Sequence, residues 1–195
     1  MRQQIRNEIA GITPLDELES SQIADTLRWI DSGTELCRTA KPATPPRHLV
    51  SYFACVDLRE GGGHVLLVDH INAQLWLPTG GHVEPGEHPR TTVLREAHEE
   101  LGLTVDQTAD FLLPTPLFLT ATETVGLTAG HVDVSLWYVL MTDRHVRLDY
   151  DAGEFHGIRW FALDAVPLTR SDPQIGRFLR KLALTTRAAG PVTAP

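Results

Sequence analysis

Three acidic residues near the middle of the chain, Glu96, Glu99 and Glu100, have a spacing that could serve metal chemistry. Successive residues of an α-helix advance by about 100°, so these carboxylates would share one helix face. The neighbouring arc is apolar and could pack on a sheet, since it carries Val93, Leu94, Ala97 and Leu101. Clustered carboxylates repel one another, and a hard divalent cation such as Mg²⁺, which prefers oxygen ligands, would reverse that cost.

An isolated E-x-x-E-E pattern is more often a solvated acidic face, because exposed charge is common on protein surfaces. Two features of the flanking sequence favour a site instead. Gly80-Gly81 and Glu84-Pro85-Gly86 predict a turn that leads into the helix and lets the backbone approach a ligand closely. Arg95 lies one helical turn before Glu99, where its guanidinium could orient the carboxylates. The alternative is a surface ion pair worth at most about half a kcal/mol.

The segment from Gly81 to Leu103 resembles the Nudix box, G-x5-E-x7-R-E-U-x-E-E-x-G-U, in which U is an aliphatic residue. All seven fixed letters are present, and the matching residues are Gly81, Glu87, Arg95, Glu96, Ala97, Glu99, Glu100, Gly102 and Leu103. At two positions the sequence departs from the commonest form of this motif. Thr79 precedes the glycine pair, which could lengthen the turn, and His88 stands where many members have a capping Ser or Thr.

The resemblance implies a hydrolase that cleaves a phosphoanhydride bond in a nucleoside triphosphate or in a nucleoside diphosphate linked to another moiety. It implies Mg²⁺ as cofactor, with Mn²⁺ as a substitute. Glu96, Glu99 and Glu100 would hold the metal, the backbone carbonyl of Gly80 would complete the shell, and Arg95 would orient the carboxylates. The substrate itself stays open among oxidised nucleoside triphosphates, nucleotide sugars, ADP-ribose, dinucleoside polyphosphates and coenzyme A.

Two glutamates are candidates for the group that handles the attacking water. Glu96 lies in the box. Some family members have a loop glutamate six residues before a tryptophan that opens the last strand, and Glu154 and Trp160 reproduce that offset. Loops carry catalytic residues disproportionately. The alternative for Glu154 is a merely polar loop, since Asp149 and Asp151 lie beside it.

The remaining pattern predicts an α/β fold, and the resemblance implies a Nudix-type α/β/α sandwich with a mixed sheet over residues 47–188. Expected helices cover residues 1–33, 88–101 and a closing segment begun by Asp172-Pro173. Expected strands cover residues 48–57, 64–70, 116–124, 131–141 and 158–161. Glu60-Gly63 predicts a turn. Residues 1–46 are expected to form a helical extension with a Pro-rich connector, and residues 189–195 a flexible tail.

Composition narrows the possible partners. The formal net charge is −8, which disfavours a stable nucleic-acid complex, and no apolar run is long enough to span a membrane. Cys37 and Cys55 fit neither a metal spacing nor a disulfide framework, and the N-terminus does not resemble a signal peptide, so a cytoplasmic location is expected. The expected partner is a small nucleotide-like molecule. The N-terminal helix could cap the pocket, form a homodimer interface, or simply pack on the domain.

Two other functions use the same fold. Isopentenyl-diphosphate isomerase depends on a catalytic cysteine and a degraded box, whereas here the box is intact and Cys55 falls in an expected strand. A nucleotide-sensing regulator would pair the fold with a DNA-binding winged helix, for which the acidic chain leaves no room after residue 188. The nine histidines show no metal-binding motif, so most are expected to be surface or core residues.

Overall fold

A computed structural model describes residues 1–189 except 42, 60–61 and 125–129. Its elements, in chain order, are α1 (Arg2–Ala10), α2 (Glu17–Asp31), β1 (Arg47–Asp57), β2 (His64–His70), β3 (Leu75–Leu77), β4 (Thr79–His82), α3 (Pro89–Leu101), α4 (Val105–Thr108), β5 (Phe118–Glu123), β6 (Val132–Met141), β7 (Phe155–Ala162), the 3₁₀ helix η2 (Leu168–Arg170) and α5 (Ile175–Ala189).

The strands form one mixed seven-stranded sheet, in the order β3-β2-β1-β6-β5. β4 also pairs with β1, and β7 pairs with β2. The pair β1–β6 is parallel, whereas the other pairs are antiparallel. β1 is therefore the central strand, bordered by β6 on one side and by β4 and then β2 on the other.

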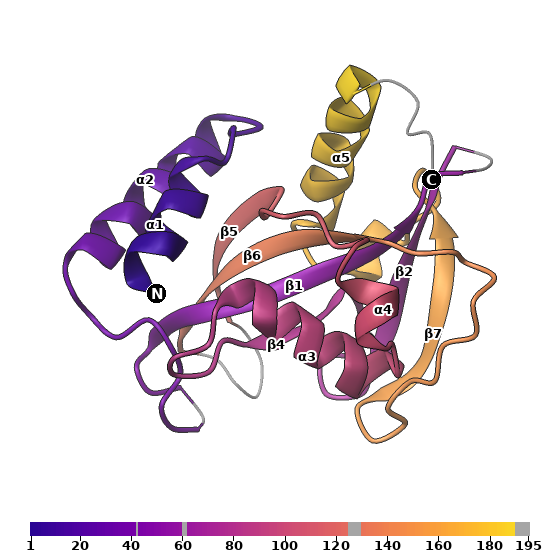
Figure 1. Ribbon diagram of the computed structural model, residues 1–195, viewed down its shortest axis with the longest axis horizontal. Helices are drawn as coiled ribbons and strands as arrows, with labels where there is room; N and C mark the ends of the chain where they lie inside the picture. The colour runs from indigo at the N-terminus through magenta and orange to yellow at the C-terminus, as the bar shows by residue number, and fades with distance from the viewer. Residues whose placement is uncertain (42, 60–61, 125–129, 190–195) are drawn as a thin grey trace.

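Side chains of β1 alternate between two cores, one on each face of the sheet. Leu49, Phe53 and Cys55 belong to a core that also contains apolar residues of α1, α2 and α3. Ala54 and Val56 belong to a second core that contains the buried face of α5. Helices thus cover both faces, and Figure 1 shows α3 and α5 on opposite sides of the sheet. This is the expected α/β/α sandwich.

Most expected elements are present, with differences at their ends. The N-terminal segment forms two helices rather than one. The second begins after Asp16, whose side chain accepts a hydrogen bond from the Glu19 N–H. β7 starts at Phe155, earlier than the expected 158. Of the expected tail, Ala189 ends α5 and the rest lies outside the described residues, as does part of the turn expected at 60–63.

The turn expected at Gly80-Gly81 is wrong. Both glycines lie inside β4, which pairs antiparallel with β1 so that Gly80 faces Tyr52 and Gly81 faces Ser51. Glycine has low strand propensity, and the strand exists because β1 supplies its hydrogen-bonding partner. The backbone beside the acidic helix is consequently held in the sheet instead of being a surface turn.

Candidate active site

The acidic helix α3 is fixed against the sheet by its apolar face. Val93, Ala97 and Leu101 are fully buried in the core that β1 shares. The helix begins after His88, whose Nδ1 accepts a hydrogen bond from the Arg90 N–H, so histidine caps this helix where Ser or Thr is commoner. With one face buried, the carboxylates of α3 are directed to the side where β4 runs.

Arg95 binds the carboxylates into one cluster. Its Nε lies 3.1 Å from Glu87 Oε1, and its Nη1 lies 2.7 Å from Glu96 Oε1 and 3.1 Å from Glu99 Oε2. Its Nη2 also donates to the carbonyl of His82 at 3.3 Å. A single guanidinium therefore joins three glutamates to the end of β4, and its fork geometry fixes their orientation.

The three box glutamates have different surroundings. The Glu99 side chain is 55% exposed, whereas Glu100 is 6% exposed and accepts a hydrogen bond from the Gly80 N–H at 2.9 Å. Burial, reinforced by the charge of Glu96, raises the pKa of Glu100 to about 9. Burial also raises the pKa of Glu96, although Arg95 opposes it. A site that raises carboxylate pKa values in this way favours a bound cation.

Glycines at positions 80 and 81 make room for these carboxylates. Gly80 has a φ of 145°, and a Cβ there would lie 2.1 Å from the carbonyl oxygen of Ser51. A Cβ on Gly81 would lie 1.9 Å from Glu96 Oε1. Any side chain at either position would therefore push β4 away from β1 or displace Glu96.

Glu154 lies in the turn before β7 and comes close to the box glutamates. Its side chain is exposed, and its backbone carbonyl accepts a hydrogen bond from the Ile71 N–H at 2.9 Å. The Glu154 charge contributes to raising the pKa of both Glu96 and Glu100, so the carboxylate lies within electrostatic range of both. The fold thus brings together the glutamates that the sequence singled out.

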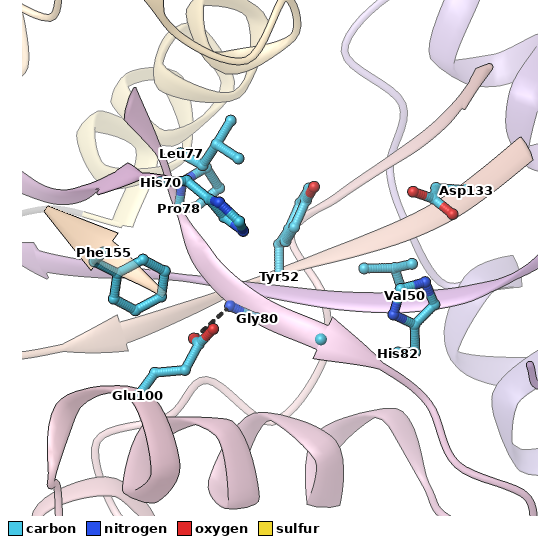
Figure 2. A pocket seen from close by; sticks show the side chains of 11 residues that line it. Val50, Tyr52, His70, Leu77, Pro78, Gly80, His82, Glu100, Asp133 and Phe155 are labelled. Carbon is cyan, nitrogen blue, oxygen red and sulfur yellow. Dashed lines mark hydrogen bonds between the residues drawn. The ribbon is translucent and has the colours of Figure 1, made fainter. Parts of the chain in front are cut away.

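A pocket of about 150 Å³ opens beside β4 and contains Glu100 and Gly80 in its wall. Figure 2 shows Glu100 reaching Gly80 from α3, with Tyr52 and His70 on the other side of the strand. Phe155 also lines the pocket, and its ring packs edge-on against that of His70, with 5.7 Å between the ring centroids. Apolar rings beside a carboxylate cluster suit a ligand with a flat ring and phosphate groups.

Sequence reasoning missed these pocket rings. Among strand aromatics, Phe53, Trp137 and Tyr138 are fully buried, in keeping with a core role. The alternation of side chains between the two faces of β1 could have indicated which aromatic residues face away from the α3 core, because residues two apart share a face. Tyr52 lies two residues from Val50 and Ala54, on the face that holds the pocket.

The end of the pocket away from Glu100 contains a histidine cluster that the sequence did not predict. His82 and Asp133 line the pocket, and His48 and His131 lie directly behind them. Burial, together with the nearby Arg38 guanidinium, lowers the pKa of His82 to about 4. His48 lies on β1, His82 on β4 and His131 just before β6, so no linear motif marks them.

Neither cysteine is available for covalent chemistry. Cys37 and Cys55 are free and buried, 7% and 1% exposed. Burial raises the pKa of the Cys37 thiol to about 11 and that of Cys55 to about 12. A thiol reacts as its thiolate, so both are inert at neutral pH.

Solved structures with this fold come from distant relatives. A C. elegans Ap4A hydrolase binary complex is 19% identical, with a TM-score of 0.58 over 72% of this chain and 98% of that one. A Nudix hydrolase from M. smegmatis is 20% identical, with a TM-score of 0.56 over 76% and 91%. The NUDIX domain of Shewanella oneidensis NrtR, complexed with ADP ribose, is 14% identical, with a TM-score of 0.53 over 70% and 86%.

No curated protein matches the chain by sequence. The family model for the NUDIX domain matches residues 48–182, more than half of the 195 residues. The matched range contains α3, Arg95 and the glutamate cluster, on the fold that these relatives share. The chain therefore belongs to the Nudix family.

Proposed function

We propose that this protein is a Mg²⁺-dependent pyrophosphohydrolase that cleaves a nucleoside triphosphate, or a nucleoside diphosphate linked to another moiety, with water as nucleophile. The observation that carries the proposal is the position of Glu100 and Glu96, which lie against the adjacent Gly80 and Gly81 of β4 at the wall of the pocket. A diphosphate lying along β4 would have its bridging oxygen beside these carboxylates.

The donor set of this site fits a hard divalent cation. Glu96, Glu99 and Glu100 lie on one helix face with Glu154 in electrostatic range. The Arg95 guanidinium bridges Glu96 and Glu99 to Glu87. Carboxylate oxygens are the ligands that Mg²⁺ and Mn²⁺ prefer. Glu96, Glu99 and Glu100, with the Gly80 carbonyl, would hold the ion, which when bound neutralises diphosphate charge and acidifies water.

The two candidate bases would divide their roles. Glu96 is fixed by Arg95 and by close contact with β4, which suits a residue that organises metal and water. Glu154 is exposed and lies on a turn, where its carboxylate can approach a bound substrate. A carboxylate bound to metal is a poor base, since the metal competes for its lone pairs. We assign assistance in proton removal to Glu154 on this ground.

The partly exposed rings of Tyr52 and His70, which line the pocket, support a nucleotide-like substrate. Two proteins that share the fold also support a nucleotide-like substrate, since one is named as an Ap4A hydrolase and the other is complexed with ADP ribose. Within the described residues, no helix combines the length and apolar character needed to cross a bilayer. With two free cysteines, this supports a cytoplasmic enzyme.

A specific observation argues against each of the two alternative functions. The isomerase reaction needs an accessible cysteine, and Cys55 is buried in the core on the α3 side of β1. A sensing domain needs binding without turnover, for which a complete carboxylate cluster has no use. Turnover therefore separates hydrolase from sensor.

The proposal predicts metal-dependent turnover of at least one nucleotide compound. A panel of nucleoside triphosphates, nucleotide sugars, ADP-ribose, dinucleoside polyphosphates and coenzyme A, scored by product identity, should give one or more cleaved compounds with Mg²⁺. Chelation should abolish cleavage and Mn²⁺ should restore it. Tight nucleotide binding without products across the panel would instead support the sensing function.

The raised pKa of Glu100 predicts that Mg²⁺ binding releases a proton. Without metal, a carboxyl group with a pKa of about 9 is protonated at pH 7, and coordination requires the carboxylate. Apparent Mg²⁺ affinity should therefore rise about tenfold per pH unit from pH 6 to 8 and level off above about pH 9. Calorimetric titration at pH 7 in buffers of different ionisation enthalpy should show about one proton released per ion.

Two variants separate Glu100 from its neighbour. Glu100→Gln should bind Mg²⁺ more weakly, release no proton and turn over at least tenfold more slowly, since one anionic ligand becomes neutral. Glu99→Gln is the matched control, because Glu99 is half exposed, and it should keep the proton release. Wild-type binding that is independent of pH would contradict the assignment of Glu100 as a ligand.

A further inference from the structure

Three neighbouring strands bring His48, His82, His131 and Asp133 to one face of the sheet. His48 on β1 is in register with Asp133 on β6, and His131 lies two residues before Asp133. His82 on β4 is in register with Val50, two residues after His48. Registered partners and residues two apart share a face. One ligand-type atom from each of the four lies within 4.8 Å of the others.

Hydrogen bonds fix which ring nitrogens carry the protons. His48 Nδ1 lies 2.9 Å from the carbonyl oxygen of Pro45, which can only accept, so Nδ1 carries a proton. The Thr124 hydroxyl donates to the His131 carbonyl at 3.1 Å, so its oxygen accepts from His131 Nδ1 at 3.0 Å. In the neutral rings, both Nε2 atoms therefore hold lone pairs.

These two lone pairs face a carboxylate. His48 Nε2 lies 3.1 Å and His131 Nε2 3.3 Å from the same oxygen, Asp133 Oδ1. His48 is fully buried, and among the described residues neither its Nε2 nor Asp133 Oδ1 makes a hydrogen bond. Three electron-rich atoms are thus held together without a donor between them, an arrangement that a cation placed at their common centre would stabilise.

We propose that His48, His82, His131 and Asp133 form a binding site for a transition-metal ion of the zinc class, separate from the carboxylate site. Imidazole nitrogens with one carboxylate suit Zn²⁺, whereas Mg²⁺ prefers oxygen alone. Ligand atoms about 2.0–2.1 Å from a tetrahedral Zn²⁺ lie about 3.4 Å from each other. The separations of Asp133 Oδ1 from the two Nε2 atoms, 3.1 and 3.3 Å, are close to that value.

The surroundings of the ligands resemble those of protein zinc sites. Metal-binding histidines commonly donate their second N–H to a carbonyl or other acceptor, as His48 does to Pro45 and His131 to Thr124.

Arg38 Nη1 lies 3.2 Å from His82 Nε2 and supplies positive charge at this edge of the cluster. Binding of the ion through His82 Nε2 would require the Arg38 side chain to swing away, which its partial exposure permits.

The site would place a second positive centre on the substrate pocket. His82 and Asp133 line the same pocket as Glu100 (Figure 2). An ion held by them would face an anionic part of the ligand at the end opposite the carboxylates, in a chain whose net charge is −8. Zinc binding itself does not depend on the proposed hydrolysis, so the two can fail independently.

Metal titration of the full-length protein tests the site. After chelation and dialysis, Zn²⁺ titrated in the presence of excess Mg²⁺ should bind with a stoichiometry near one. Co²⁺ in place of Zn²⁺ should give the visible absorption of a tetrahedral nitrogen- and oxygen-ligated ion. Asp133→Asn, which keeps the side-chain shape, should weaken Zn²⁺ binding at least tenfold.

Controls separate this site from the others. His156→Gln removes an exposed histidine outside the cluster and should leave Zn²⁺ binding unchanged, as should Glu100→Gln in the carboxylate site. Arg38→Gln should bind Zn²⁺ at least as tightly as the wild type. Substoichiometric Zn²⁺ binding by the wild type, or equal affinity in Asp133→Asn, would overturn the proposal.

Discussion

Glu154→Gln is expected to lower kcat about a hundredfold while leaving Mg²⁺ affinity within about twofold of the wild type. Loss of a general base typically costs two to four orders of magnitude in rate, and Glu154 lies outside the cluster that Arg95 holds. Glu96→Gln should reduce both kcat and Mg²⁺ affinity, since Glu96 contacts Arg95 at 2.7 Å and lies against Gly81.

The measurements are steady-state kinetics over a range of pH and calorimetric titration of Mg²⁺ into each variant. Asp149→Asn is the matched control, because Asp149 is an exposed acid in the same loop whose pair with Arg147 is on the surface. It should retain near-normal kcat. If Glu154→Gln also retains near-normal kcat, Glu154 has no part in the reaction, and the base is Glu96 or a metal-bound hydroxide.

Glu19→Ala is expected to destabilise the fold by about 3–5 kcal/mol, the usual result of leaving a buried charge without its partner. Glu19 is fully buried on α2 and accepts from Lys181 Nζ on α5 at 2.6 Å. It also accepts from the backbone N–H groups of Leu119 at 3.1 Å and Leu15 at 2.6 Å. The N-terminal helices are thereby attached to the sheet edge and to the closing helix.

Thermal or urea unfolding would show this as a fall in melting temperature on the order of 10 °C for a chain of this size. Glu17→Ala, an exposed acid on the same helix turn, is the control and should change stability by less than about 0.5 kcal/mol. The double variant Glu19→Leu with Lys181→Met should be more stable than Glu19→Ala, because no charge is left buried. A Glu19→Ala protein as stable as the control would show that residues 1–46 fold separately.

Periodic elements were predictable from the sequence, because their pattern is local. The apolar arc of α3 and the spacing of its glutamates defined both the helix and the face that bears the carboxylates. A position of Glu154 near the cluster was expected only from the resemblance to family members, and it arises because β7 pairs with β2.

Features that depend on pairing between distant segments were not predictable. Thr79–His82 has the composition of a turn and becomes β4 only because β1 lies beside it. The histidine cluster depends on the registers of β1 with β4 and with β6, which no local pattern encodes. Tyr52 and Phe155 both line the pocket because β1 pairs with β4 and β7 pairs with β2.

The alternation of side chains along β1 means that this strand cannot tolerate insertions or deletions. His48, Val50 and Tyr52 serve the pocket face, while Leu49 and Phe53 fill the core under α3. A single inserted or deleted residue would exchange these two sets, burying polar groups in the core and exposing apolar ones to the pocket. Length changes in this strand should therefore be lethal to folding and function together, whereas the connector before it and the loops beyond it can absorb them.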